Sequence, residues 1–303
     1  MKYTPLGNTG FEVSRIGYGG IVSSQHFDGA TIAGDGQKMS DEYVSWARNM
    51  GVNYFDVAPS YGDAQLLLGN SLVPFRKDIY LACKTNKRKR EDAEKEMEES
   101  LRLLHTDYFD LYQLHGLSTM EELETCFCPH GTMELLEDMK KNGLTRKIGF
   151  TAHSEAVALK ALTLYDFDTV MFPLNWHMHL SHGMGEELRK TVREKNLGLL
   201  AIKSMIRSAW PGKEERYASS YPKSWCKPFE VEKEGEYLKA AMTYTLSLGA
   251  DVLIPPGNFA HFSFAVNHLE EVLEKKTDGF EKLASLLPQV NAAPFFEPFA
   301  YEK

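Results

Sequence analysis

The stretch GVNYFDVAPSYGDAQLLLG, residues 51–69, contains the clearest structural pattern of this chain. Its first half, residues 52–58, is short and apolar apart from Asn53 and Asp56, which is typical of a buried strand. Residues 59–63 break the strand, and the pattern predicts that a helix begins at Ala64. A buried carboxylate is unfavourable unless a cation pairs with it, so Asp56 predicts a cationic partner near the end of this strand.

The same unit of strand followed by helix recurs along all 303 residues. Eight such units predict a (β/α)8 TIM barrel, and an open doubly wound sheet is the main alternative. No G-x-G-x-x-G motif follows the first predicted strand, which disfavours the open sheet. The predicted strands span residues 15–20, 52–58, 79–85, 109–115, 147–152, 170–175, 198–204 and 252–255, and the helices 41–50, 64–72, 92–104, 132–142, 155–164, 186–195, 235–248 and 262–274.

An N-terminal β-hairpin is predicted around the turn at residues 7–10, and residues 1–303 are expected to form a single domain with 278–303 as a C-terminal tail. Long loops at residues 116–131 and 205–234 follow predicted strands, so they belong to the C-terminal face, where barrel enzymes build their sites. The second loop and the tail are rich in aromatic residues, which suit either an apolar substrate wall or packing over the rim. These residues are Trp210, Tyr217, Tyr221, Trp225, Phe229, Phe295, Phe296, Phe299 and Tyr301.

The composition, with 43% hydrophobic and 25% charged residues, is typical of a soluble globular protein. No run approaches the length of a membrane span and the N-terminus lacks a signal-peptide core, so we expect a cytoplasmic protein without membrane contact. A net charge of -8 argues against nucleic-acid binding. Any anionic ligand must therefore be held by local donors.

Four ionisable side chains fall near the ends of three consecutive predicted strands: Asp56, Tyr61, Lys84 and His115. A barrel gathers these ends around its mouth, and Asp56 is the nearest candidate partner for Lys84. A free tyrosine has a pKa of about 10, and a neighbouring ammonium lowers it and makes the phenol a usable acid. With His115 this gives a donor pair aimed at a carbonyl oxygen, and a bound cofactor must supply the hydride.

The motifs FDVAPSYG (55–62), ACKTN (82–86) and LYQLHG (111–116) resemble the aldo-keto reductases in order and spacing. The similarity continues through RKIGFTAHS, FPLNW and LIPPG to Asn267. This resemblance implies an enzyme that binds NADPH, or sometimes NADH, across the barrel mouth and reduces small aldehydes or ketones. It also implies that Tyr61 is the general acid, Lys84 lowers its pKa, Asp56 holds Lys84, and His115 orients the carbonyl.

The resemblance assigns cofactor contacts less evenly. Thr151 and Asn175 correspond to contacts with the nicotinamide carboxamide, whereas Lys203 stands where many relatives stack an aromatic ring and could reach a phosphate instead. The start of the last helix suits the adenosine phosphates, but no arginine or lysine follows Gly257, which leaves NADP(H) and NAD(H) both open. The predicted cofactor-binding residues are Gly20, Ile21, Asp56, Thr151, Asn175, Lys203, Ser204, Arg207, Pro256, Gly257, Asn258, His261 and Asn267.

No metal site is predicted, because neither the Cys126–His130 segment nor the histidines at 177, 179 and 182 form paired ligand clusters. The basic run at residues 87–90 is interpreted as a solvated lead-in to a helix. Two functions compete with carbonyl reduction: an aldolase that forms a Schiff base on Lys84, and a non-catalytic NADP-sensing regulatory subunit. The sequence indicates no particular oligomeric state.

Overall fold

The computed structural model describes residues 1–274 and 279–290. Within them, eight parallel strands form one sheet in the order β14-β11-β10-β9-β8-β7-β6-β3. A parallel bridge between Ile16 and Leu253 joins the two edges, which confirms the predicted (β/α)8 barrel. The strands are β3 (Tyr18–Gly19), β6 (Tyr54–Asp56), β7 (Tyr80–Thr85), β8 (Phe109–Leu117), β9 (Thr145–Ala152), β10 (Thr169–Phe172), β11 (Gly198–Ile202) and β14 (Val252–Ile254).

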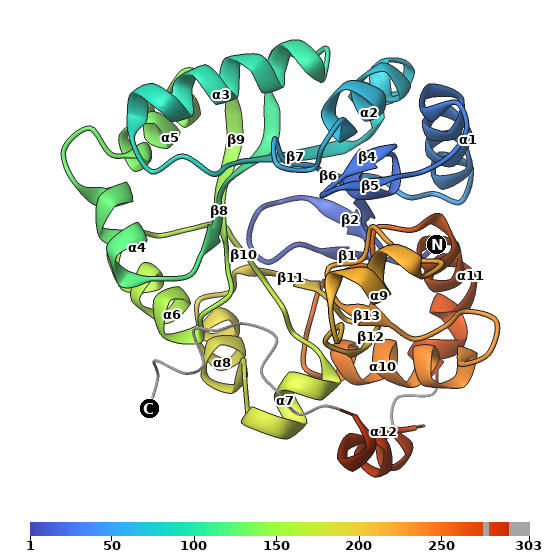
Figure 1. The fold of residues 1–303 in the computed structure, drawn as a ribbon. Coiled ribbons are helices and arrows are strands. Elements are labelled where there is room, and N and C mark those ends of the chain that lie inside the picture. The colour runs from blue at the N-terminus through green and yellow to red at the C-terminus, as the bar shows by residue number, and fades with distance from the viewer. Residues whose placement is uncertain (275–278, 291–303) are drawn as a thin grey trace.

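The main helices surround the strands as an outer layer (Figure 1). Local sequence signals set several of their starts: the side chains of Asp35 and Ser154 accept hydrogen bonds from backbone N–H groups of the first turns that follow them. No described helix combines the length and apolar character needed to cross a bilayer. The outer helices are α1 (Gly36–Asn49), α2 (Ala64–Leu72), α3 (Arg90–Leu103), α5 (Thr132–Lys141), α6 (Glu155–Leu164), α8 (Glu186–Glu194), α10 (Gly235–Ser247) and α11 (Phe259–Glu274).

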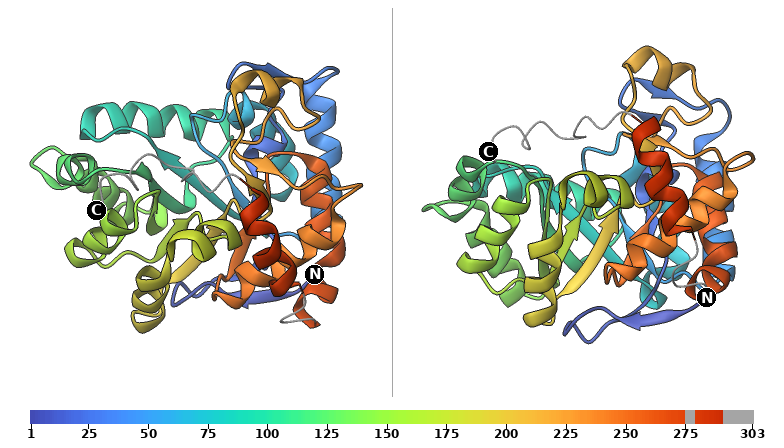
Figure 2. Two further views of the ribbon diagram at one scale, coloured as in Figure 1. Left: turned by 60° about the horizontal axis from the view of Figure 1, so that its bottom comes forward. Right: turned by 90° about the horizontal axis from the view of Figure 1, so that it is seen from below.

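The predicted N-terminal hairpin is formed by β1 (Tyr3–Pro5) and β2 (Glu12–Ser14), which pair antiparallel. Its side chains Leu6, Phe11 and Val13 are buried in one cluster with the inward-facing Leu111 and Leu200 of the barrel. The hairpin therefore closes one end of the barrel (Figure 2, right). The candidate site lies at the opposite end, where the carboxyl ends of the strands meet.

The long connection at residues 205–234, called the strap below, lies over the carboxyl ends of the strands (Figure 2). The Arg216 guanidinium lies 2.6 Å from the Asp28 carboxylate, and the Tyr217 hydroxyl donates to the Asp28 carbonyl at 2.7 Å. These contacts fix the strap to the hairpin of β4 (His26–Phe27) and β5 (Ala30–Thr31). The strap contains β12 (Ile206–Ser208), α9 (Lys213–Ala218) and β13 (Lys227–Pro228).

The remaining α-helices of the described chain are α4 (Met120–Phe127), α7 (Trp176–His182) and α12 (Phe280–Leu286), and short 3-10 helices span Gly20–Val22, Val73–Asp78 and Leu287–Gln289. Helix α12 begins inside the segment predicted as a tail, and Phe280 packs edge-on against Tyr244 of α10 at 4.9 Å between ring centres. The four aromatic residues predicted for the tail, at positions 295, 296, 299 and 301, lie outside the described residues.

Candidate active site

Lys84 and Asp56 form a buried ion pair at the barrel mouth, with side chains 0% and 2% exposed. Asp56 is paired in register with Ala82, so Lys84, two residues further along β7, projects from the same face. The Lys84 ammonium also donates to the Val57 carbonyl at 3.3 Å, and Gln113 Nε2 donates to Asp56 Oδ2 at 3.1 Å. Both carboxylate oxygens are therefore bonded, which offsets part of the desolvation of this pair.

Tyr61 and His115 lie beside this ion pair. The Lys84 ammonium is 5.3 Å from the centre of the Tyr61 ring, and the rings of Tyr61 and His115 pack edge to face at 5.7 Å. The structure thus brings together the four ionisable side chains that were predicted to meet because they lie near the ends of neighbouring strands.

Gly62 and Asp63 fix the turn that carries Tyr61. Gly62 has φ +62°, and an added Cβ would collide with the carbonyl oxygen of His26. Asp63 Oδ1 accepts hydrogen bonds from Ser24 Oγ at 2.8 Å and from the backbone N–H groups of Gln25 and His26 at 2.9 and 3.1 Å. The loop after β3 is thereby held against the turn, and Phe27 contacts the Tyr61 ring edge-on at 6.3 Å.

The pKa of Tyr61 differs from the expectation that the nearby ammonium brings it below its usual value. Burial raises the pKa of Tyr61, and the nearby Lys84 charge opposes this rise without reversing it. Burial alone would lower the pKa of Lys84, but the attraction of Asp56 and Tyr61 raises it, so Lys84 stays an ammonium. Burial, followed by the charges of Lys84 and Arg88, lowers the pKa of His115 well below its usual range, so its imidazole is neutral.

A cleft of about 710 Å³ opens above these residues. Its walls come from the ends of the strands, the strap and the loop after β14, and its apolar floor includes Met171, Ile202 and Ile254. Lys84 is fully buried and does not line the cleft, and its ammonium faces the Tyr61 ring. The predicted site residues that line the cleft are Asp56, Tyr61, His115, Ile21, Thr151, Lys203, Pro256 and Gly257.

Other predicted cofactor residues do not line this cleft. Asn175 is buried and serves as the N-cap of α7, with its side chain accepting from Met178 N at 2.9 Å. His261 is buried 2.8 Å from the Phe229 carbonyl, and Asn267 is exposed on α11.

The remaining four members of that group are Arg207, Asn258, Ser204 and Gly20, and none of them lines the cleft either. Arg207 pairs with Glu234 at 3.2 Å, and Asn258 Nδ2 donates to Ser224 Oγ at 2.6 Å. Ser204 is fully buried, and a Cβ added to Gly20 would press on Val57.

The cleft also contains basic residues that sequence reasoning assigned to no site. His153 Nε2 lies 3.1 Å from the Lys203 ammonium. Arg88 belongs to the basic run at residues 87–90 interpreted as solvated, but its side chain is only 16% exposed. It donates to the His115 carbonyl at 2.8 Å and lies 3.3 Å from Glu122. Side-chain alternation along β9 could have identified His153, because it lies two residues after Thr151.

The described residues contain no group of three or more His, Cys, Asp or Glu side chains arranged to hold a metal ion. His179, one of the crowded histidines, lies instead 2.8 Å from the Tyr244 hydroxyl and 3.2 Å from Glu186.

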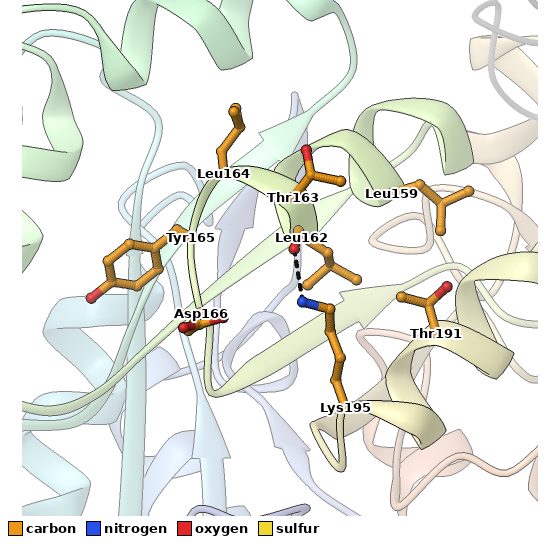
Figure 3. Close-up of a pocket in the computed structure, with 8 residues that line it drawn as sticks. All are labelled: Leu159, Leu162, Thr163, Leu164, Tyr165, Asp166, Thr191 and Lys195. Carbon is orange, nitrogen blue, oxygen red and sulfur yellow. Dashed lines mark hydrogen bonds between the residues drawn. The ribbon is translucent and has the colours of Figure 1, made fainter.

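Another cavity, of about 440 Å³, is lined by residues of α6, α8 and the segments that follow them (Figure 3), and it shares no lining residue with the cleft. There the Lys195 ammonium donates to the Leu162 carbonyl at 3.1 Å, close to the end of α6. A cation at this position satisfies a carbonyl that the helix leaves free, which accounts for the lysine structurally.

Comparisons with known proteins agree with this architecture. The model of the aldo/keto reductase family matches residues 29–284. The aldo-keto reductase YhdN of Bacillus subtilis is 26% identical over 257 residues, covering 79% of this chain and 74% of that protein. L-galactose dehydrogenase of Arabidopsis thaliana is 31% identical over 168 residues, covering 50% of this chain and 48% of its own.

A solved structure shows the same fold. The aldo-keto reductase AKR11C1 from Bacillus halodurans, in its holo form, matches with a TM-score of 0.68 at 19% identity, covering 93% of this chain and 96% of its own. Since the family model spans most of the sequence and the barrel is shared, the chain is a member of the aldo/keto reductase family and an oxidoreductase by that membership.

Proposed function

We propose that this oxidoreductase uses NAD(P)H to reduce the carbonyl group of an aldehyde or ketone to an alcohol. The observation that carries the proposal is the position of Tyr61, which lines an open cleft, contacts His115 and lies above the buried Lys84–Asp56 pair. These groups supply a proton donor, a neutral hydrogen-bonding imidazole and a fixed positive charge in one place.

The residues around the cleft fit a nicotinamide dinucleotide. Gly19 and Gly257 line it without side chains, and Nδ1 of His115 is buried with no hydrogen-bond partner in the described part of the chain. Ile21, Thr151, Pro256 and Gly257 would hold the cofactor, together with Lys203 if its charge meets a phosphate. The reduced nicotinamide, when bound, supplies the hydride that no side chain can provide.

The proton that the carbonyl oxygen receives comes from a side chain of the protein. The raised pKa of Tyr61 keeps its phenol protonated, so it can donate to the carbonyl oxygen as negative charge develops there. The Lys84 charge, held by Asp56 and Gln113, then stabilises the phenolate that remains. A neutral His115 donates a second hydrogen bond to the same oxygen.

Replacing Tyr61 tests this assignment. Tyr61→Phe removes only the acidic proton, so we expect kcat to fall by about 10²–10⁴-fold, the usual contribution of a general acid. Fluorescence titration with NADPH and with NADH should give nearly unchanged dissociation constants. Tyr3→Phe, which alters an exposed tyrosine on the closed end of the barrel, is the matched control and should retain full turnover. Full turnover by Tyr61→Phe would overturn the proposal.

The two competing functions make different demands on the site. A Schiff-base aldolase needs an accessible lysine, whereas Lys84 is fully buried and bonded to Asp56 and the Val57 carbonyl. Borohydride should therefore trap no substrate on Lys84. Tight binding of NADPH without turnover over a broad carbonyl panel would instead identify a nucleotide-sensing subunit.

A further inference from the structure

Residues 21–27, called the connecting segment below, contact both the strap and the turn that carries Tyr61. On the strap side, the Lys223 ammonium donates to three backbone carbonyls of this segment. These carbonyls belong to Ile21, Val22 and Ser24, at 2.8, 3.0 and 2.7 Å. Lys223 is only 4% exposed, and hydrogen bonds donated by a charged group are stronger than neutral ones. The strap therefore fixes the backbone of the connecting segment at three points.

The other side of the connecting segment is bonded to the turn. Asp63 Oδ1 accepts from the Ser24 hydroxyl at 2.8 Å and from the N–H groups of the next two residues at 2.9 and 3.1 Å. Ser24 thus bonds Lys223 through its carbonyl and Asp63 through its hydroxyl. Asp63 lies two residues after Tyr61 and does not line the cleft, so its contacts act on the turn.

Aromatic side chains connect the strap and Tyr61 by a second route. Trp225, two residues after Lys223, packs edge-on against Phe27 at 5.5 Å between ring centres. Phe27 is 2% exposed and packs edge-on against Tyr61 at 6.3 Å. Because Trp225 also lines the cleft, the part of the strap that faces a ligand is the part that contacts the neighbours of Tyr61.

We propose that Lys223 and Asp63 are positioning residues for Tyr61. By fixing the connecting segment from both sides, they hold the tyrosine ring beside Lys84 and His115. The proposal rests on the proposed function, because it concerns the same tyrosine. Proton transfer needs a heavy-atom distance of about 2.6–3.2 Å, and a displacement of about 1 Å can lower the rate about 100-fold. Losing either side of this support should therefore slow turnover.

Turnover of a panel of aldehydes and ketones tests this assignment at about pH 7, where Lys223 is mostly charged although burial lowers its pKa to about 8. Lys223→Met and Asp63→Ala should each lower kcat by about 10–100-fold. Asp63→Asn keeps an Oδ1 acceptor for the three donors and should retain most of the turnover. Lys227→Met is the matched control and should retain full turnover, because Lys227 lies on the strap, pairs with Glu215 at 2.5 Å and does not line the cleft.

The Tyr61→Phe background separates positioning from other causes. An effect that passes through the phenol cannot act when the phenol is absent, so adding Asp63→Ala to Tyr61→Phe should change the residual turnover by less than about twofold. An equal loss in both backgrounds would show that Asp63 acts on the fold as a whole, and the proposal would be wrong. An unchanged kcat in Lys223→Met or in Asp63→Ala would also overturn it.

Hydrogen exchange followed by mass spectrometry supplies a measurement that does not depend on activity. Lys223→Met should speed the exchange of the backbone amides at residues 58–64, which are distant from position 223 in sequence, whereas Lys227→Met should leave it unchanged. Unchanged exchange in Lys223→Met would refute the connection. If the wild-type protein turns over no carbonyl of the panel, the proposed function fails separately. The exchange comparison then still decides whether Lys223 fixes the Tyr61 turn: faster exchange supports this connection, and unchanged exchange refutes it.

Discussion

At the scale of single residues, the Lys84–Asp56 pair shows how a lysine is kept charged inside an apolar layer. The ammonium has Asp56 and the Val57 carbonyl as partners, and the second oxygen of Asp56 accepts from Gln113. Each partner is satisfied only while the others are present. The pair therefore stabilises the fold, apart from the part proposed for it in the reaction.

Removing one member of the pair should be worse than removing both. Asp56→Asn leaves a buried ammonium without its carboxylate, and we expect the free energy of unfolding to fall by about 3–5 kcal/mol. Urea denaturation followed by circular dichroism measures this change. The double variant Asp56→Asn/Lys84→Met should recover part of the loss, and a double variant that is less stable than the single one would contradict this account.

Residue-level prediction from the sequence succeeded where position along a strand alone determines the outcome. Asp56, Tyr61, Lys84 and His115 come together because parallel strands of a barrel end at one rim. It did less well where local hydrogen bonds redirect a side chain. Asn175 caps α7 instead of lining the cleft, because an asparagine before a helix readily accepts from the N–H groups of its first turn.

At the scale of elements, the strap is connected to the rest of the molecule through buried polar groups. Lys223 Nζ donates to the carbonyls of Ile21, Val22 and Ser24 at 2.8, 3.0 and 2.7 Å, which joins the strap to the loop after β3. His261 of α11 donates through Nε2 to the Phe229 carbonyl on the other side of the strap. Contacts between residues so distant in sequence leave no local pattern, so the sequence predicted a long loop but not its path.

The His261 contact should make the fold sensitive to acid. Burial lowers the pKa of His261 to about 4, although the bond to Phe229 opposes this, because a second proton would sit on the buried Nδ1, which has no partner among the described residues. The unfolded chain binds that proton at a pKa of about 6.5, so the stabilisation is complete above that pH and is lost as the pH falls toward 4.

We therefore expect His261 to account for about 2–3 kcal/mol of the loss in unfolding free energy between about pH 7.5 and about pH 4.5. His261→Gln keeps a donor for Phe229 and should flatten this part of the profile. Urea denaturation at the two pH values, compared between wild type and variant, measures the difference. An unchanged pH dependence in the variant would show that other groups are responsible.

At the scale of the whole molecule, the hairpin that packs into the barrel and the cleft lie at opposite ends of the barrel axis. The N-terminal hairpin fills the closed end, with Phe11 stacked on Tyr80 at 4.6 Å and covered by the Arg146 guanidinium. The cleft lies at the other end. Loops at the mouth can therefore change without disturbing the interior.

Phe11→Ala tests this separation. Loss of a buried ring should lower the free energy of unfolding by about 3–5 kcal/mol. Because the ring lies at the end opposite the cleft, kcat/KM for a carbonyl substrate should stay unchanged below the melting range. Thermal denaturation and steady-state kinetics on the same preparation check both parts, and a large fall in kcat/KM at full folding would show that the two ends are coupled.

The overall topology was accessible from the sequence because eight apolar runs alternate with amphipathic helices, and each predicted strand overlaps an observed one. Strand ends were less accurate: β10 ends at Phe172, directly before Pro173, although the prediction extended to residue 175. A proline lacks the N–H group that a strand ladder needs.

The junction of the first and last strands has a mechanical consequence. There the ring is closed by one bridge between Ile16 and Leu253, with Gly17 N–H donating to the Leu253 carbonyl and Leu253 N–H to the Arg15 carbonyl, both at 2.9 Å. Local opening of the sheet should be most frequent at this junction, because few backbone hydrogen bonds must break there. The rim can then widen to admit or release a large ligand while the other strands keep their register.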